Sequence, residues 1–274
     1  MMKKRFFWVV FAFVLGVWAC KTIGPPDYTI YPNPPMPGFN LAGSDTAAIR
    51  LADEVMNSVG GRKAWDEAHY LKWTFFGHRT LVWDKWAGRV RVTAPSKGLA
   101  VVVNLADKTG LVFRDRQLET NPDTIAKYLN WGYEVWVNDS YWLVMPFKMK
   151  DSGVTLKYLG VLPTKDDVDA DVVEMTFAGV GVTPQNKYRV YINQSSKYIT
   201  QWDFFSNVAN EKPDFTGAWL DYRPAGGLMF STNRGDGGLS DICNFKEVPD
   251  STWTGRLEPN WTSVLYPPKK KQKK

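Results

Sequence analysis

Histidine and cysteine, which often carry catalysis or hold zinc, are scarce in this chain. His69 and His78 are the only histidines, and neither lies near a Gly-x-Ser-x-Gly turn that would present a serine nucleophile. The chain has two cysteines, so clustered Cys and His ligands for zinc are also missing from the sequence. We therefore expect no catalytic residue, no metal centre and no cofactor.

Carboxylates give two weaker signals. Residues 166–171 have the Asp-x-Asp-x-Asp spacing of a calcium loop, but valine and alanine stand where an EF-hand needs glycine and glutamate. We expect a solvated hairpin loop there, with a calcium site as the alternative. Asp139, Asp203 and Asp221 each lie beside aromatic residues, which would suit a sugar-cleaving site. Their spacing does not bring two of them into one cleft, as glycosidase chemistry requires.

The positive charge of the chain lies at its two ends. The formal net charge is +6, but the basic residues at positions 3–5 and the five lysines within residues 269–274 account for more than all of it. The chain between these ends is slightly acidic, so we expect no nucleic-acid partner. Apolar residues make up 44% of the chain and include 13 Trp, enough for a large apolar core or groove.

Residues 1–19 have the order of an export signal, with a basic start followed by a short apolar run. The run ends with Ala19 before Cys20, which resembles the processing site of a bacterial lipoprotein, whose cysteine is lipidated. Trp18 departs from that pattern, because a small residue usually stands there. We expect residues 1–19 to be removed and Cys20 to anchor the chain to a membrane. An uncleaved signal anchor and ordinary cleavage are the alternatives.

The following segment, residues 20–43, is predicted to be an extended tether, because residues 21–43 contain six prolines. Lys21 follows the cysteine without an acidic retention signal. By resemblance to bacterial lipoprotein sorting, this implies an outer-membrane location facing the periplasm. The other cysteine, Cys243, lies in an expected strand and is interpreted as a buried structural residue.

The pattern over residues 44–262 indicates one mainly β domain. A helix is expected over residues 44–61, followed by a short helical turn. From residue 71 onward, alternating apolar segments separated by turn residues indicate about ten antiparallel strands. They are interrupted by a second helix over residues 124–135. The basic tail, residues 263–274, is predicted to be disordered.

Residues 136–160 form the stretch around which the domain is organised. Turn signals at residues 138–140 and 151–153 divide it, and a strand is expected after the second. The run at residues 141–145 is predicted to be buried on both faces. Some of the aromatic residues are expected to line a cavity for an acyl chain; the alternative is that they fill the space between helix and sheet. The cavity candidates are Trp131, Trp136, Tyr141, Trp142, Met145 and Phe147, and the polar candidates at its mouth are Asn138, Asp139 and Lys148.

A helix that ends at residues 59–61, then Ala64-Trp65 and a long antiparallel meander, resembles the periplasmic lipoprotein carriers and receptors (LolA/LolB-like). Residues 136–160, with residues 177–184 and 187–191 after them, resemble more closely an uncharacterised bacterial lipoprotein family that is expected to share this fold. The resemblance implies a mainly β (α+β) domain with a single open half-barrel sheet and two or three helices covering its concave face. In the carriers that cavity shelters acyl chains, but no motif transfers their functional residues to this chain.

Three functions compete on these observations. The first is a membrane-anchored periplasmic lipoprotein that binds a lipid, a lipoprotein acyl chain or another apolar ligand non-covalently in a half-barrel cavity. The second is a structural or protein-interaction lipoprotein with a self-filled core and an envelope protein as partner. The third, an envelope hydrolase, needs convergent carboxylates or a Ser-His pair that the sequence does not place together. We expect the first.

Overall fold

The computed structural model describes residues 33–265, except residues 180 and 182. Helix α1 (Thr46–Ser58) comes first, and its apolar residues lie at helical spacing on one buried face. Gly60 and Gly61 follow it with left-handed φ angles of 121° and 84°, which glycine adopts without steric cost. The short helix α2 (Gly61–Glu67) begins there. Both helical predictions at this end of the chain are confirmed.

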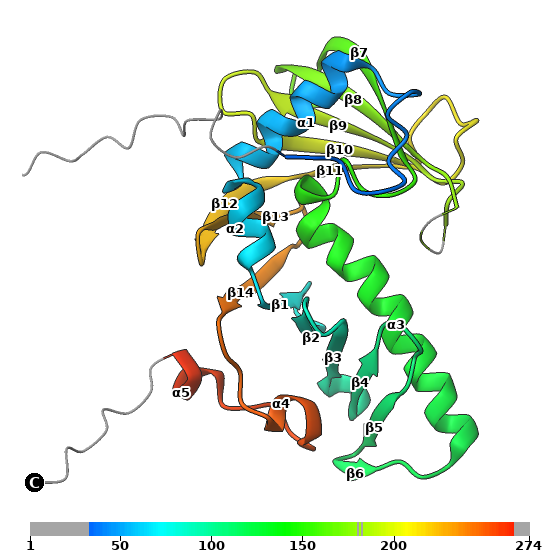
Figure 1. Cartoon of the computed structure of the whole chain (residues 1–274), viewed down its shortest axis with the longest axis vertical. Coiled ribbons are helices and arrows are strands. Elements are labelled where there is room, and N and C mark those ends of the chain that lie inside the picture. The colour runs from blue at the N-terminus through cyan, green and yellow to red at the C-terminus, as the bar shows by residue number, and fades with distance from the viewer. Residues whose placement is uncertain (1–32, 180, 182, 266–274) are drawn as a thin grey trace, which may run out of the picture.

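A seven-stranded antiparallel sheet forms the lower part of the molecule in Figure 1, in the order β14-β1-β2-β3-β4-β5-β6. Short turns join β1 to β6 in sequence, because turn residues separate the alternating apolar runs as predicted. The last strand, β14, returns from the end of the chain to pair with β1. The elements are β1 (Tyr70–Phe75), β2 (Arg79–Asp84), β3 (Arg89–Ala94), η1 (Pro95–Lys97), β4 (Leu99–Asn104), β5 (Gly110–Arg114), β6 (Gln117–Leu118) and β14 (Leu239–Phe245).

A five-stranded antiparallel sheet, in the order β11-β10-β9-β8-β7, lies at the other end of the molecule, and α1 covers one of its faces (Figure 1). A two-stranded sheet, β12-β13, lies between the two larger sheets. The strands are β7 (Val154–Pro163), β8 (Asp169–Phe177), β9 (Lys187–Asn193), β10 (Ile199–Phe205), β11 (Phe215–Ala218), β12 (Leu220–Ala225) and β13 (Leu228–Asn233).

Helix α3 (Pro122–Val144) runs along the seven-stranded sheet and ends near the five-stranded sheet (Figure 1). Asn121 caps its start by accepting a hydrogen bond from the backbone N–H of Thr124 at 2.9 Å. The prediction of a turn at residues 138–140 is wrong, because these residues continue the helix. Asp139 is buried there and bound by Arg79, so tertiary contacts outweigh the local preference for a turn.

The apolar run at residues 141–145 is therefore not an extended segment between two layers. Its first four residues form the last turn of α3, and Met145 begins a short 3-10 helix, η2 (Met145–Phe147). Leu143, Val144 and Met145 are buried, whereas Tyr141 and Trp142 are partly exposed. The turn predicted at residues 151–153 is confirmed, since β7 begins directly after it.

Two apolar cores result from this arrangement. One lies between α3 and the inner face of the seven-stranded sheet, which carries Leu81, Val92 and Val101. The other lies between α1 and the five-stranded sheet. The C-terminal segment covers the outer face of the seven-stranded sheet, where Trp253 of α4 (Ser251–Thr254) packs on Val82, and α5 (Trp261–Leu265) follows.

The mainly β fold with open antiparallel sheets and a few helices is as predicted. The number of strands differs: the described residues form fourteen strands in three sheets, where about ten in one sheet were expected. Strands as short as β6, with two residues, show no alternation that a sequence pattern can reveal.

Both predicted ends of the domain are shifted. The tether prediction is wrong over residues 33–43, because Phe39 is buried and the backbone N–H of Asn40 donates to Val154 of β7. Residues 263–265 belong to α5 rather than to a disordered tail. The predicted signal, Cys20, the rest of the tether and the rest of the basic tail lie outside the described residues.

Candidate functional site

Helix α3 approaches the inner face of the seven-stranded sheet most closely at Gly132. A Cβ atom at this position would lie 2.9 Å from Cγ1 of Val101 on β4, which is closer than ordinary contact. The missing side chain therefore lets the helix backbone rest directly on the strand. The space between helix and sheet is closed by this contact.

Three indole N–H groups in the apolar core that includes this layer have no hydrogen-bond partner among the described residues. They belong to Trp73, Trp83 and Trp136, and the rings of the last two meet edge to face at 5.4 Å. Nearly all buried donors in proteins are satisfied, so three orphaned donors in one apolar core require an explanation. Neither Trp73 nor Trp83 was among the sequence candidates, because a Trp on the buried face of a strand looks like ordinary core.

Two arginines hold the C-terminal end of α3. Arg79 on β2 donates to both carboxylate oxygens of Asp139, from Nε at 2.5 Å and from Nη2 at 2.7 Å. Arg234 donates from Nη2 to the carbonyl oxygen of Trp142 at 2.5 Å. Toward the start of α3 the contacts are apolar or cation–π, as between Arg114 and Tyr128, and the side-chain bond from Lys108 to Asn130 is exposed. The helix is thus fixed by polar contacts at one end.

The structure divides the six predicted cavity residues between two cores. Trp131, Trp136 and Phe147 pack in the core under α3, whereas Tyr141 and Met145 pack against the five-stranded sheet. Trp142 belongs to both, and its ring meets those of Phe75 and Trp202 at 6.3 Å and 4.8 Å. These residues do not surround one common cavity.

The polar residues predicted at a cavity mouth are already engaged. Asp139 is fully buried in its bidentate ion pair, so its placement at a mouth is wrong. Asn138 donates from Nδ2 to Oδ1 of Asp139 at 2.9 Å and supports that pair. Lys148 pairs with Asp151 three residues later. The sequence cannot reveal Arg79 as the partner of Asp139, since 60 residues separate the two.

A cluster of aromatic side chains around the buried Trp202 extends from Trp142 across the inner face of the five-stranded sheet. Trp202 contacts Tyr188 at 5.0 Å and Phe215 at 6.4 Å between ring centroids, and Phe215 is 44% exposed. The Nε1 of Trp202 and the hydroxyl of Tyr141 in this cluster have no partner among the described residues. Burial raises the pKa of Tyr141 well above its usual value, so the hydroxyl keeps its proton.

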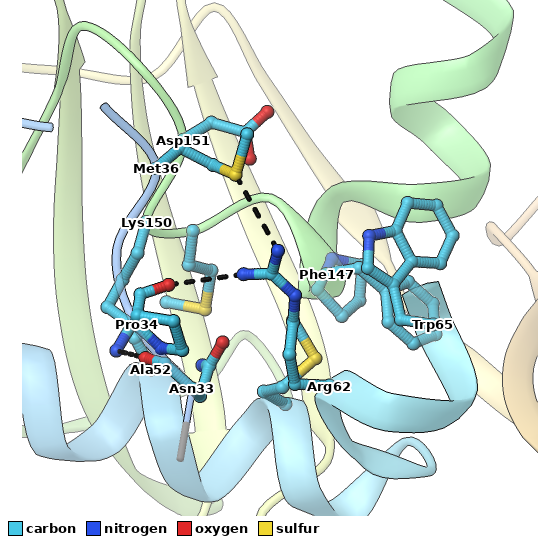
Figure 2. A pocket seen from close by; sticks show the side chains of 12 residues that line it. Asn33, Pro34, Met36, Ala52, Arg62, Trp65, Phe147, Lys150 and Asp151 are labelled. Carbon is cyan, nitrogen blue, oxygen red and sulfur yellow. Dashed lines mark hydrogen bonds between the residues drawn. The ribbon is translucent and has the colours of Figure 1, made fainter. Parts of the chain in front are cut away.

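A small cleft with a mixed polar and apolar lining lies between α1, α2 and η2 and is closed by residues 33–36 (Figure 2). Trp65 of α2 stacks on Phe147 of η2 at 4.6 Å on one side. The cleft holds about 30 Å³, which suffices for water molecules but not for an acyl chain. The remaining lining side chains are Met36, Ala52, Met56, Arg62, Pro146, Met149 and Lys150, with Asn33, Pro34 and Asp151 at its edge.

The other sequence candidates lie apart from this region. His69 is stacked between Tyr70 and Trp86 and lies 3.1 Å from Asp84, whereas His78 is exposed in the turn after β1. Asp203 and Asp221 lie on β10 and β12 and share no cleft with Asp139. Cys243 is half-buried in β14, where burial raises its thiol pKa.

The Asp-rich run forms the hairpin between β7 and β8, as predicted. Asp171 accepts a hydrogen bond from the hydroxyl of Tyr158 at 2.8 Å. In the part of the chain that the structure describes, no group of three His, Cys, Asp or Glu side chains is placed to hold a metal ion. Within the same residues, no helix combines the length and the apolar character needed to cross a membrane.

Comparison with known proteins gives a structural likeness without a sequence match. No family model matches the chain, and no curated protein matches it. A DUF1329 family protein from Desulfovibrio piger is similar over 75% of this chain and 96% of that chain, with 10% identity and a TM-score of 0.42. A LolA superfamily protein from Nitrosomonas europaea is similar over 74% of this chain and 96% of that chain, with 13% identity and a TM-score of 0.37. A LolA superfamily protein is thus among the neighbours, as the resemblance in the sequence predicts.

Proposed function

We propose that this protein is a membrane-tethered envelope protein that binds an apolar ligand, such as an acyl chain, without chemical conversion. The ligand would lie between α3 and the inner face of the seven-stranded sheet. The proposal includes an N-terminal lipid anchor at Cys20 and a location at the outer membrane facing the periplasm, both inferred from the sequence.

The observation that carries the proposal is the set of orphaned indole donors under α3. Trp83 and Trp136, whose rings meet under α3, and Trp73 on β1 offer three N–H groups inside one apolar core. An apolar ligand with a few acceptor oxygens would satisfy them, which is the composition expected of a ligand site. Burying a sixteen-carbon chain contributes roughly 10 kcal/mol before ordering costs, so no catalytic group is required for tight binding.

The layer is closed in the described state, so binding requires α3 to move away from the sheet. Its C-terminal end is fixed by buried bonds from Arg79 and Arg234, whereas its contacts toward the start are apolar or lie with exposed cations such as Lys108. We therefore propose that α3 acts as a lid that pivots near residues 139–142. Apolar contacts suit such motion, because a ligand can replace them without leaving charges unpaired.

A reversible disulfide between Val101 and Gly132 tests this proposal. The ideal Cβ position of Gly132 lies 3.5 Å from Cβ of Val101, which is within the range of natural disulfides. V101C/G132C in a Cys243→Ala background, in the chain from residue 21 onward, would lock α3 onto β4. Uptake of cis-parinaric acid, followed by its fluorescence, should fall at least tenfold on oxidation and return on reduction.

The matched control is Cys243→Ala alone, whose uptake should not respond to oxidant or reductant. Equal uptake by the oxidised and reduced double variant would show that α3 does not have to move. No measurable uptake in either state would remove the proposed binding function.

A structural or protein-interaction role is the second candidate, and one observation favours it specifically. The close approach of Gly132 to Val101 leaves no room for a ligand while α3 is seated. In that case the aromatic residues fill the core, and the exposed Phe215 beside Trp202 would meet an envelope protein partner. Unchanged hydrogen exchange of α3 in the presence of detergent-free lipid vesicles would support this role.

A further inference from the structure

Residues 33–36, here called the strap, close the cleft of Figure 2 with their own carbonyl oxygens. Arg62 donates from Nη1 to the carbonyl of Pro34 at 3.1 Å, and Lys150 donates from Nζ to the carbonyl of Asn33. The strap therefore gives two neutral acceptors to two cationic side chains at the edge of a cleft whose buried floor is apolar.

The strap is also held by hydrogen bonds from Asn33 Nδ2 to Asp53 and from the backbone N–H of Met36 to the carbonyl of Lys150, and it lies over a deeply buried floor. Met36 is 43% exposed, whereas Ala52 and Met149 beneath it are each 1% exposed and Phe147 is 4% exposed. Lifting the strap would uncover apolar side chains that are now out of water. Because methionine has a flexible and polarizable side chain, a floor that includes Met56 and Met149 can adapt to the shape of a new occupant.

The charges at the cleft indicate which head group fits. Arg62 is paired with Asp66 at 2.8 Å, and the Nζ of Lys150 is paired with Asp53. A free carboxylate would therefore add an unbalanced negative charge beside Asp53 and Asp66. An uncharged carbonyl group would replace those of Asn33 and Pro34 without disturbing either ion pair.

We propose that this cleft is a second ligand site, which takes an ester- or amide-linked acyl chain when the strap lifts, with the acyl carbonyl held by Arg62 or Lys150. This site goes beyond the proposed function, because neither Gly132 nor Val101 lines it and α3 does not have to move, although Phe147 is shared with the core under α3. In the absence of ligand, the carbonyl groups of the strap occupy the positions that the acyl carbonyl would take. Because it is the first described part of the segment that leads from Cys20, binding here would release that segment from the body.

The test compares two probes with the same polyene chain, methyl cis-parinarate and cis-parinaric acid. The strap is loosened by P34G/M36S in the chain from residue 21 onward, which keeps every helix and strand of the described fold. We expect the methyl ester to bind this variant at least tenfold more tightly than the unaltered chain, and more tightly than the free acid. Pro35→Ser, a change in the strap outside the lining of the cleft, should leave ester binding nearly unchanged.

A synthetic peptide with the sequence of residues 31–38 should displace the ester from the loosened variant. Displacement by phosphatidylethanolamine vesicles or by an N-palmitoyl peptide distinguishes a membrane ester from a lipoprotein amide as the source, and either result supports the site. No gain in ester binding after loosening the strap, or tighter binding of the free acid, would overturn the proposal. If the double variant does not fold, Pro34→Gly alone should also increase the binding of the methyl ester. This single variant should fold, because Pro34 is exposed.

Repeating the measurement in the oxidised V101C/G132C background separates the two proposals. Ester binding at the cleft should persist with α3 locked, because neither of the two locked positions, 101 and 132, lines the cleft. Loss of ester binding on locking would place the ligand under α3 and overturn the cleft site. A third outcome is that the ester still binds the cleft while oxidation leaves the uptake of parinaric acid unchanged. That outcome would contradict only the proposal that α3 acts as a lid.

Discussion

Arg234 and Trp142 are joined by a hydrogen bond of 2.5 Å from guanidinium Nη2 to the carbonyl oxygen in the last turn of α3. Arg234 is 3% exposed and lies over the ring of Trp219 at 3.7 Å. No ion pair within the described part of the chain includes Arg234, and burial lowers its pKa to about 9. The negative end of the α3 dipole is the charge that compensates it.

Arg234→Met should therefore loosen the end of α3. The change leaves the carbonyl of Trp142 without its donor, and we expect a loss of about 2–4 kcal/mol in the free energy of unfolding. Urea denaturation measures the loss, and hydrogen exchange should show faster exchange in residues 139–144. Arg223→Met, an exposed arginine on β12, is the matched control and should change the stability by less than about 0.5 kcal/mol.

The ion pair between Arg79 and Asp139 should show strong coupling. Arg79→Met leaves a fully buried carboxylate without its cation, and a loss of about 3–5 kcal/mol is expected. The double variant R79M/D139L should lose less than Arg79→Met alone, because no buried charge remains. Equal or greater loss in the double variant would mean that the pair contributes by packing rather than by charge.

Gly132 should resist even the smallest side chain. A Cβ atom there would meet Val101 at 2.9 Å, so Gly132→Ala should destabilise the fold by about 1–3 kcal/mol, although alanine favours helix by about 1 kcal/mol. Val101→Ala in the same chain should restore part of the loss by removing the clashing methyl groups. A stabilising effect of Gly132→Ala alone would show that helix and strand are not in close contact.

Lys85 should give the protein a stability that rises with pH. Burial lowers its pKa from 10.5 to about 8, while it donates to the carbonyl of Trp65. Between these two pH values the unfolded chain binds more protons than the folded chain, so the free energy of unfolding increases with pH. Below pH 8 the folded protein bears the whole cost of burying a charged Lys85. Relative to Lys85→Met, the wild type should gain about 1–3 kcal/mol between pH 8 and pH 10.5. Lys127→Met on the exposed side of α3 is the matched control.

Trp142→Ala tests whether Trp142 only packs in the core or also contacts the ligand. Trp142 contacts both cores, so we expect a loss of about 3–5 kcal/mol in stability. If the folded variant also loses parinaric acid uptake while keeping cooperative unfolding, the residue contacts the ligand as well. Uptake that is unchanged in the folded fraction would restrict Trp142 to the core.

Local sequence patterns predicted most helices and strands, because apolar periodicity and turn residues can be recognised within a few neighbouring residues. Helix α1 and the hairpins of the seven-stranded sheet follow from apolar periodicity and turn residues. The path of α3 could not be predicted, since Asn138, Asp139 and Ser140 favour a turn locally. Their helical conformation depends on Arg79, which lies 60 residues before Asp139.

The candidate site was predictable in composition but not in arrangement. The aromatic excess around Trp142 predicted a ligand site in this part of the chain, yet the sequence could not show that Tyr141 and Trp136 pack in different cores. The prolines before residue 37 indicated an extended segment, and only the structure places Pro34 and Met36 over a cleft. Contacts between distant segments decide both arrangements.

Native mass spectrometry of the chain from residue 21 onward, purified from a bacterial periplasm without detergent, tests the binding function most directly. The account predicts a discrete added mass that organic extraction removes and that lipid analysis identifies as an acyl-containing molecule. A clean mass of the protein alone, together with no uptake of parinaric acid or its methyl ester, would contradict it.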